Sequence, residues 1–138
     1  MGMLDGVKVL DFTHAYAGPF CTMTMADFGA QVIKIEKVSG GDQARSWGPF
    51  KNGYSGYYAS FNRGKKSLPL DLRAPEAKEI IRRLIAESDI ICSNFKAGTM
   101  EKMGFSYEEV RQIKPDIIYA ELSGFGNKGA LSAYAAYD

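Results

Sequence analysis

The chain has 138 residues, of which 46% are hydrophobic and 24% are charged, as in a globular protein with a substantial core. Seventeen lysines and arginines balance sixteen aspartates and glutamates, so a net charge of +1 does not favour nucleic-acid binding. No run approaches the roughly 18 apolar residues of a membrane span, and no secretory leader pattern opens the chain. The two cysteines, Cys21 and Cys92, indicate no disulfide framework. We therefore expect a cytoplasmic protein with no nucleic-acid, membrane or metal partner.

The first half of the chain predicts two strands, over 7–12 and 31–36, with a helix over 19–28 between them. Residues 38–56 are rich in glycine, serine and asparagine, which predicts an irregular segment. A short helix follows and ends in a turn at Gly64. Residues 67–72 are predicted to be extended, and Pro69 marks them as an edge strand or no true strand.

The second half contains the strongest helix pattern, over 75–88, where Pro75 suits the first helical position. The predicted inner face of this helix is an apolar stripe of Ala77, Ile80, Ile81, Leu84 and Ile85. Strands are predicted over 89–95 and 117–122. Between them, Ser106 and Glu109 form a capping box that starts a helix ending near Lys114.

Alternating strands and helices favour an α/β fold with a mainly parallel, Rossmann-like sheet flanked by helices. In such sheets, ligands bind outside the carboxyl ends of the strands. Four loops are predicted to meet there, at residues 13–19, 37–45, 93–98 and 123–129. These loops are the predicted walls of a ligand cleft.

Basic residues concentrate in one stretch of the chain. Between Lys34 and Arg73 there are eight basic residues and three acidic ones. A local positive field of this kind attracts an anionic ligand such as a phosphate-bearing cofactor. Ordinary solvated surface is the alternative interpretation, and the sequence leaves both open.

Two patterns suggest other chemistry. The segment GFGNKG, residues 124–129, fits the dinucleotide pattern, and Glu36 lies where a ribose-binding acid would follow the second strand. That mechanism needs a helix to start at the glycines, so a dinucleotide-dependent oxidoreductase is an alternative rather than the main hypothesis. His14, the only histidine, and Cys21 could pair as base and nucleophile, but the sequence places no acid to orient them.

Six blocks in order along the chain resemble a known family. They are LDGVKVLDFTHAYAGPF, ADFGAQVIKIEK, GGDQAR with WGP, FNRGKKSLPLDL, NFKAGTMEKMGF, and IIYAELSGFG with a later glycine. Together they resemble the amino-terminal part of the family III CoA-transferases, the CaiB/BaiF type that includes formyl-CoA transferase. The resemblance covers essentially the whole chain and implies a single amino-terminal CoA-binding α/β domain over residues 1–138.

The resemblance implies an enzyme that moves coenzyme A from an acyl-CoA to a carboxylic acid through an aspartyl intermediate. CoA and acyl-CoA are then substrates, with no tightly bound cofactor. The family aspartate is expected downstream of Asp138, so the resemblance implies no catalytic residue in this chain. We expect a truncated piece, inactive alone, of a longer protein that forms an interlocked homodimer.

The resemblance also implies which residues contact CoA. Tyr16 and Ala17 would line the thiol end, and Lys37 would lie near the adenine and phosphates. The remaining expected contacts are Leu70, Asp71, Leu72 and Arg73 at the adenosine, Asn94, Phe95, Lys96 and Lys102 in the next segment, and Ala135, Ala136, Tyr137 and Asp138 at the pantetheine and acyl end.

Two further hypotheses remain beside the transferase. Racemases of 2-methylacyl-CoA resemble the same blocks but have histidine before the acid of the last motif, where this chain has Tyr137. A non-catalytic CoA-binding or nucleotide-binding module is the other alternative. The basic stretch and the poor fit of GFGNKG to a helix start favour CoA over NAD.

Overall fold

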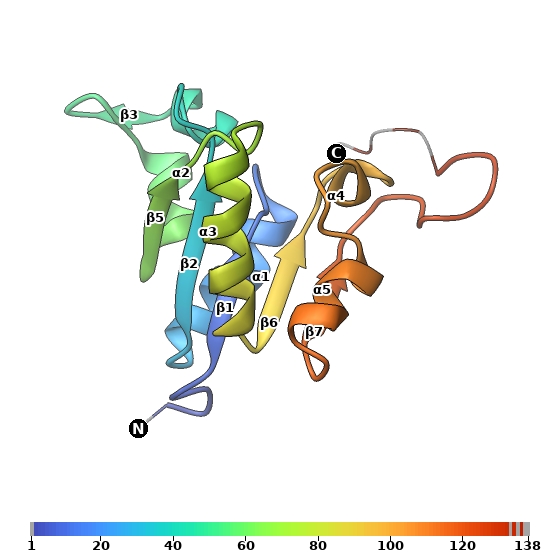
Figure 1. Cartoon of the computed structure of the whole chain (residues 1–138). Helices are drawn as coiled ribbons and strands as arrows, with labels where there is room; N and C mark the ends of the chain where they lie inside the picture. Colours follow the sequence, from blue (N-terminus) through green and yellow to red (C-terminus); the bar gives the residue numbers. More distant parts are fainter. Residues whose placement is uncertain (1, 133, 135, 137–138) are drawn as a thin grey trace.

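The computed structural model describes residues 2–132, 134 and 136, and its centre is a five-stranded sheet (Figure 1). The strand order is β5-β2-β1-β6-β7, and every pair is parallel. The bounds are β1 Lys8–Asp11, β2 Gln31–Glu36, β5 Lys65–Pro69, β6 Ile90–Ser93 and β7 Ile118–Glu121. This confirms the predicted fold class, a mainly parallel sheet flanked by helices.

Helices cover both faces of the sheet (Figure 1). Helices α3, α4 and α5 pack on one face through a core that includes Ile81, Met100 and Val110. Helix α1 packs on the other face, over Val9 and Val32, and α2 lies against α1. The helix bounds are α1 Ala17–Asp27, α2 Gly56–Asn62, α3 Pro75–Ala86, α4 Thr99–Lys102 and α5 Tyr107–Ile113.

Most of the predicted elements are present. β2 has the predicted bounds, the capping box at Ser106 is formed, and Pro69 ends the edge strand β5. The sequence analysis did not predict α4. The apolar stripe of α3 is only partly correct, because Ala77, Ile81 and Ile85 are buried whereas Ile80 is 42% exposed.

The segment 38–56 is more ordered than predicted. It contains a short 3-10 helix, η1 (Gln43–Ser46), and a hairpin formed by β3 (Phe50–Lys51) and β4 (Tyr54–Ser55). Asn52 and Gly53 at the hairpin turn both have positive φ, as a tight two-residue turn requires. The hairpin projects from the upper left of the molecule in Figure 1. Two-residue strands are too short to produce a visible alternating pattern.

Candidate functional site

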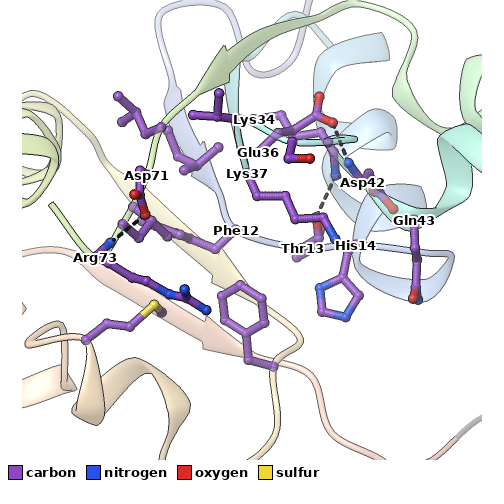
Figure 2. A pocket seen from close by; sticks show the side chains of 18 residues that line it. Phe12, Thr13, His14, Lys34, Glu36, Lys37, Asp42, Gln43, Asp71 and Arg73 are labelled. Carbon is purple, nitrogen blue, oxygen red and sulfur yellow. Dashed lines mark hydrogen bonds and ion pairs between the residues drawn. The ribbon is translucent and has the colours of Figure 1, made fainter.

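A cleft of about 710 Å³ lies at the carboxyl ends of β1, β2 and β5 (Figure 2). One wall comes from the loop after β2, which carries Lys37, and another from the segment after β5, which ends at Arg73. The parallel register brings these loops together, because all strands end at the same edge of the sheet. Six residues predicted to contact CoA line this cleft, namely Lys37, Leu70, Asp71, Leu72, Arg73 and Phe95.

A second cleft of about 880 Å³ adjoins the first along the same edge of the sheet. It lies between the start of α1, the loop after β6 and the segment after β7. Predicted CoA contacts that line it are Tyr16, Ala17, Asn94, Phe95, Lys96 and Ala136. His14 and Phe95 line both clefts, so the two form one elongated depression.

His14 and Phe95 form the boundary between the clefts. Their ring centroids are 5.2 Å apart at an interplanar angle of 39°. Burial lowers the pKa of His14 below 6.5, and although Asp42 raises it, Lys34 and Lys37 lower it further. The imidazole is therefore neutral at pH 7, and it adds no positive charge to the cleft.

The positive charge of the first cleft comes from three basic side chains. Lys34 is 1% exposed and its ammonium pairs with Asp42 Oδ2 at 2.9 Å, so its charge is neutralised inside the protein. Lys37 and Arg73 are exposed, and within the described residues neither side-chain cation has a hydrogen bond or ion pair. Figure 2 shows Arg73 on the opposite side of the cleft from Asp42 and Gln43. An anionic ligand can therefore reach two cations that have no counter-ion among the described residues.

Glu36, at the end of β2, is buried and occupied by donors of the chain itself. Its carboxylate accepts hydrogen bonds from the Arg45 guanidinium, the Tyr58 and Ser67 hydroxyls and the Asp42 backbone N–H. A ribose hydroxyl would have to displace one of these donors. The ribose-binding role considered for Glu36 is therefore disfavoured, and Glu36 is instead a buried residue whose ion-pair partner is Arg45.

The glycine segment 124–129 lacks the helix that dinucleotide binding needs. Among the described residues, no helix begins after β7. Gly124 instead lies so close to Ala136 that a Cβ at position 124 would be 2.0 Å from the Ala136 Cβ. Gly124 therefore allows two chain segments to pack together at the second cleft.

Buried side chains fix the loop that follows β1. Asp11 is fully buried and its Oδ1 accepts from the Thr13 N–H at 2.8 Å, while its Oδ2 accepts from Lys65 Nζ at 3.0 Å. Asn94 accepts from the His14 N–H at 2.9 Å and donates to the His14 carbonyl at 2.8 Å. Both polar atoms of the Asn94 side chain thus hold the backbone of His14 in place.

Some predicted site residues lie elsewhere. Lys102 is an exposed residue of α4 and lines neither cleft. Ala135, Tyr137 and Asp138 lie outside the described residues. Cys21 is half-buried in α1 and Cys92 is buried in β6. Burial raises the pKa of the Cys92 thiol to about 12, so it is protonated at pH 7.

The CoA contacts predicted from the sequence did not include the cleft residues Thr13, Lys34, Asp42 and Gln43, of which only Lys34 lies outside the four predicted loops. One available signal was a lysine in the middle of the apolar strand QVIKIE, because a buried lysine needs a partner. Within the described residues, no cluster of histidine, cysteine, aspartate or glutamate could hold a metal ion. None of the described helices is both long enough and apolar enough to cross a membrane.

The fold and the cleft define a Rossmann-like α/β protein with an elongated binding depression at the carboxyl edge of its parallel sheet. A likeness to shikimate 5-dehydrogenase from Listeria monocytogenes, with a TM-score of 0.50 at 17% identity, concerns this fold alone. The chain belongs to CoA-transferase family III, whose sequence model matches residues 4–138. The resemblance stated from the six sequence blocks is thus confirmed.

Curated relatives are similar over nearly the whole chain. Human succinyl-CoA:glutarate CoA-transferase is 44% identical over 136 residues, covering 98% of this chain and 31% of the relative. Succinyl-CoA:mesaconate CoA-transferase from Haloarcula hispanica is 48% identical over 132 residues, covering 92% of this chain and 33% of the relative. Acetyl-CoA:oxalate CoA-transferase from Acetobacter aceti is 42% identical over 137 residues, covering 99% and 35%. The chain spans about a third of the length of these relatives.

Solved structures agree with the same family. A CaiB/BaiF family protein from Brucella suis has a TM-score of 0.93 at 41% identity, over 99% of this chain and 37% of that one. A protein from Mycobacterium tuberculosis has a TM-score of 0.92 at 38% identity, and the match covers 100% of this chain and 38% of that one. The described fold is thus that of part of a CaiB/BaiF family protein.

Proposed function

We propose that the protein is a CoA-transferase that moves coenzyme A from an acyl-CoA to a carboxylic acid, and that residues 1–138 supply its CoA-binding part. The named relatives are transferases of CoA between carboxylic acids, which supports transfer rather than racemisation. The observation that carries the proposal is the elongated depression, with Lys37 and Arg73 in one half and Tyr16 and Ala17 in the other.

The shape and charge of the depression suit the parts of CoA. The phosphates of CoA are anionic, and Lys37 and Arg73 are the exposed cations of the first cleft. Phe95 separates this charged half from the second cleft, where the pantetheine arm and thiol would reach Tyr16 at the start of α1. NAD has no such arm to place in the second cleft. We therefore expect CoA to bind more tightly than NAD.

The chemistry that we propose uses an aspartate outside residues 1–138. Its carboxylate attacks the thioester carbonyl of the acyl-CoA, and the C–S bond breaks, which releases the CoA thiolate and leaves a mixed anhydride of the aspartate and the donor acid. The thiolate then attacks the aspartyl carbonyl, which releases the donor acid and leaves an aspartyl-CoA thioester. The acceptor carboxylate attacks this thioester and expels the CoA thiolate, which leaves a second mixed anhydride. The thiolate then attacks the acceptor carbonyl of this anhydride, which forms the new acyl-CoA and releases the aspartate.

The two buried acids that line the first cleft, Glu36 and Asp42, do not suit this role. Glu36 accepts hydrogen bonds from Arg45 and other donors, and Asp42 forms an ion pair with Lys34. Burial raises the pKa of Glu36, but hydrogen bonds from Arg45, the Asp42 N–H, Ser67 and Tyr58 lower it to about 2. A carboxylate stabilised by so many donors is a poor nucleophile, so these acids act structurally.

The test uses the full-length protein. Calorimetry with CoA and with NAD should show tighter binding of CoA, and tighter binding of NAD would overturn the ligand assignment. Incubation with succinyl-CoA, quenching and peptide mapping by mass spectrometry should locate a CoA or acyl adduct on an aspartate beyond position 138. An adduct on Asp138 or on any earlier residue would overturn the assignment of the nucleophile.

The proposal extends to assembly and location, a cytoplasmic homodimer with interlocked chains. Ile118 in the edge strand β7 is 60% exposed, and apolar side chains at a sheet edge favour coverage by further structure. Light scattering of the full-length protein should give twice the monomer mass. A monomer at micromolar concentration would contradict this part of the proposal.

A further inference from the structure

The backbone of Thr13–Ala15, between β1 and α1, is held almost entirely by side chains from other segments. The Thr13 carbonyl accepts from Lys34 Nζ, and both backbone polar groups of His14 bond to Asn94. The Ala15 N–H donates to Asp42 Oδ1 at 3.1 Å. This loop leads directly into Tyr16 and Ala17 at the second cleft.

Ala15 has an unfavourable backbone conformation. Its φ is +66°, and Asn52 is the only other non-glycine residue with positive φ in the described part of the chain. Asparagine tolerates the left-handed region, whereas the Cβ of alanine crowds the backbone there. Alanine persists in this conformation only where its surroundings impose it. The hydrogen bond from its N–H to Asp42 Oδ1 is one contact that acts on this residue directly.

Asp42 connects three parts of the cleft wall. It is 4% exposed, its Oδ1 also accepts from the Ala44 N–H at 2.9 Å, and its Oδ2 pairs with Lys34 Nζ at 2.9 Å. Its own N–H donates to Glu36 Oε2 at 2.7 Å. Figure 2 shows Asp42 beside Lys34 and Thr13 on one side of the first cleft. One buried carboxylate thus joins the loop after β1 to the loop that carries Lys37.

We propose that Asp42 is a positioning residue of the CoA site. It holds Ala15 in the left-handed conformation through Oδ1, and this directs Tyr16 and Ala17 into the second cleft. It thereby fixes the position of the loop after β1, which would contact the thiol end of CoA, relative to the loop that carries Lys37. The inference depends on the proposed function only for the identity of the ligand, which is CoA.

Two matched variants of the full-length protein separate the hydrogen bond from the buried ion pair. Lys34→Met with Asp42→Asn removes both charges and keeps an oxygen acceptor for the Ala15 N–H. Lys34→Met with Asp42→Leu removes the same charges and the acceptor. Replacing a buried ion pair by apolar groups of similar volume is often tolerated, so both variants are expected to fold. A difference between the two variants therefore measures the effect of the oxygen acceptor at position 42.

The first readout is independent of CoA. Hydrogen–deuterium exchange of peptides that span 12–18 should be faster in the Leu variant than in the Asn variant. The second readout is CoA affinity by calorimetry, which should be about tenfold weaker in the Leu variant. Adding Ala15→Gly to the Leu variant should restore most of the affinity, because glycine adopts positive φ without the Cβ penalty. Ala59→Gly, at an exposed position in α2, should restore none.

A further measurement does not require the Leu variant to fold. In the natural background, Ala15→Gly should raise the melting temperature, whereas Ala59→Gly should lower it. Equal exchange and equal affinity in the Asn and Leu variants would overturn the inference. So would a lowered melting temperature for Ala15→Gly. If the natural protein does not bind CoA, the proposed function fails, and the exchange and melting comparisons still decide whether Asp42 holds Ala15.

Discussion

The Arg45 guanidinium forms a two-point hydrogen bond with the Glu36 carboxylate, from Nε to Oε2 at 2.8 Å and from Nη2 to Oε1 at 2.7 Å. The guanidinium carbon also lies 3.8 Å from the centroid of the Tyr58 ring. Glu36 ends β2, and Arg45 lies in η1. The pair therefore closes the loop between them, which carries Lys37 and Asp42 into the first cleft.

This pair predicts a loss of stability in acid. Burial raises the pKa of Glu36, but the hydrogen bonds from Arg45 and its other donors lower it to about 2, from 4.5 in an unfolded chain. A lowered folded-state pKa contributes stability that is present above 4.5 and is lost as pH falls toward 2. The difference corresponds to on the order of 3 kcal/mol. Urea unfolding should show the gap between the natural protein and Glu36→Gln narrowing below pH 4.5.

The exposed Glu87 offers a control for this pH effect. Its partner is Lys8, and both side chains are largely in water. Glu87→Gln should leave the stability curve parallel to that of the natural protein at every pH. A gap for Glu36→Gln that stays constant from pH 6 to pH 3 would show that the Glu36 carboxylate does not titrate as described.

Two arginine–carboxylate pairs of different burial should respond differently to removal of the arginine. Arg45→Met leaves the buried Glu36 charge with fewer donors, and we expect a loss of about 2–3 kcal/mol in the free energy of unfolding. Arg63→Met breaks the exposed pair with Asp27, for which about 0.5 kcal/mol is typical. Urea unfolding at pH 7 measures both. Equal losses would mean that burial of Glu36 does not matter.

The elements that the sequence predicted well carry strong local signals. The capping box at Ser106, the proline at the start of α3 and the apolar run of β2 each determine local geometry within a few residues. Helix α4 and the hairpin of β3 and β4 are too short for a periodic pattern. The exposure of Ile80 was not predictable, because a stripe shows which face is apolar and not how much of it is covered.

The candidate site was predictable at the level of loops rather than of contacts. Parallel strands bring their carboxyl ends together, so the loops of Tyr16, Lys37 and Asn94 could be expected to meet. The pairing of Lys34 with Asp42 depends on the path of the loop between them, which no local pattern reveals. For the same reason the use of Asn94 to hold His14 was missed.

The two exposed cations of the first cleft, Lys37 and Arg73, predict a salt-dependent effect on CoA affinity. Lys37→Glu and Arg73→Glu should each weaken CoA binding about tenfold at low salt, and the loss should shrink as salt screens the interaction. Lys51→Glu makes the same charge change on the hairpin, outside both clefts, and should have little effect. Calorimetry at two salt concentrations measures this. Unchanged affinity in both cleft variants at low salt would mean that the basic stretch is ordinary surface.

The two hydrogen bonds between Asn94 and His14 predict that the Asn94 side chain supports CoA binding by holding the loop after β1 in place. Asn94→Leu leaves both backbone groups of His14 without a partner, which should cost about 1–3 kcal/mol of stability and displace the boundary formed with Phe95. CoA affinity should fall about tenfold. Part of the free energy lost with the two hydrogen bonds lowers the stability of the fold, and the rest allows the loop to leave its binding position.

Asn94→Asp separates the two hydrogen bonds. It keeps the acceptor for the His14 N–H and loses the donor to the His14 carbonyl, so its affinity should lie between those of the natural protein and the leucine variant. Ser60→Ala removes a single exposed hydrogen bond to the Gly56 carbonyl in α2, outside both clefts, and serves as the control, with unchanged affinity expected. Calorimetry and thermal denaturation of the same samples separate binding from stability. Natural CoA affinity in Asn94→Leu would show that the loop holds its position without Asn94.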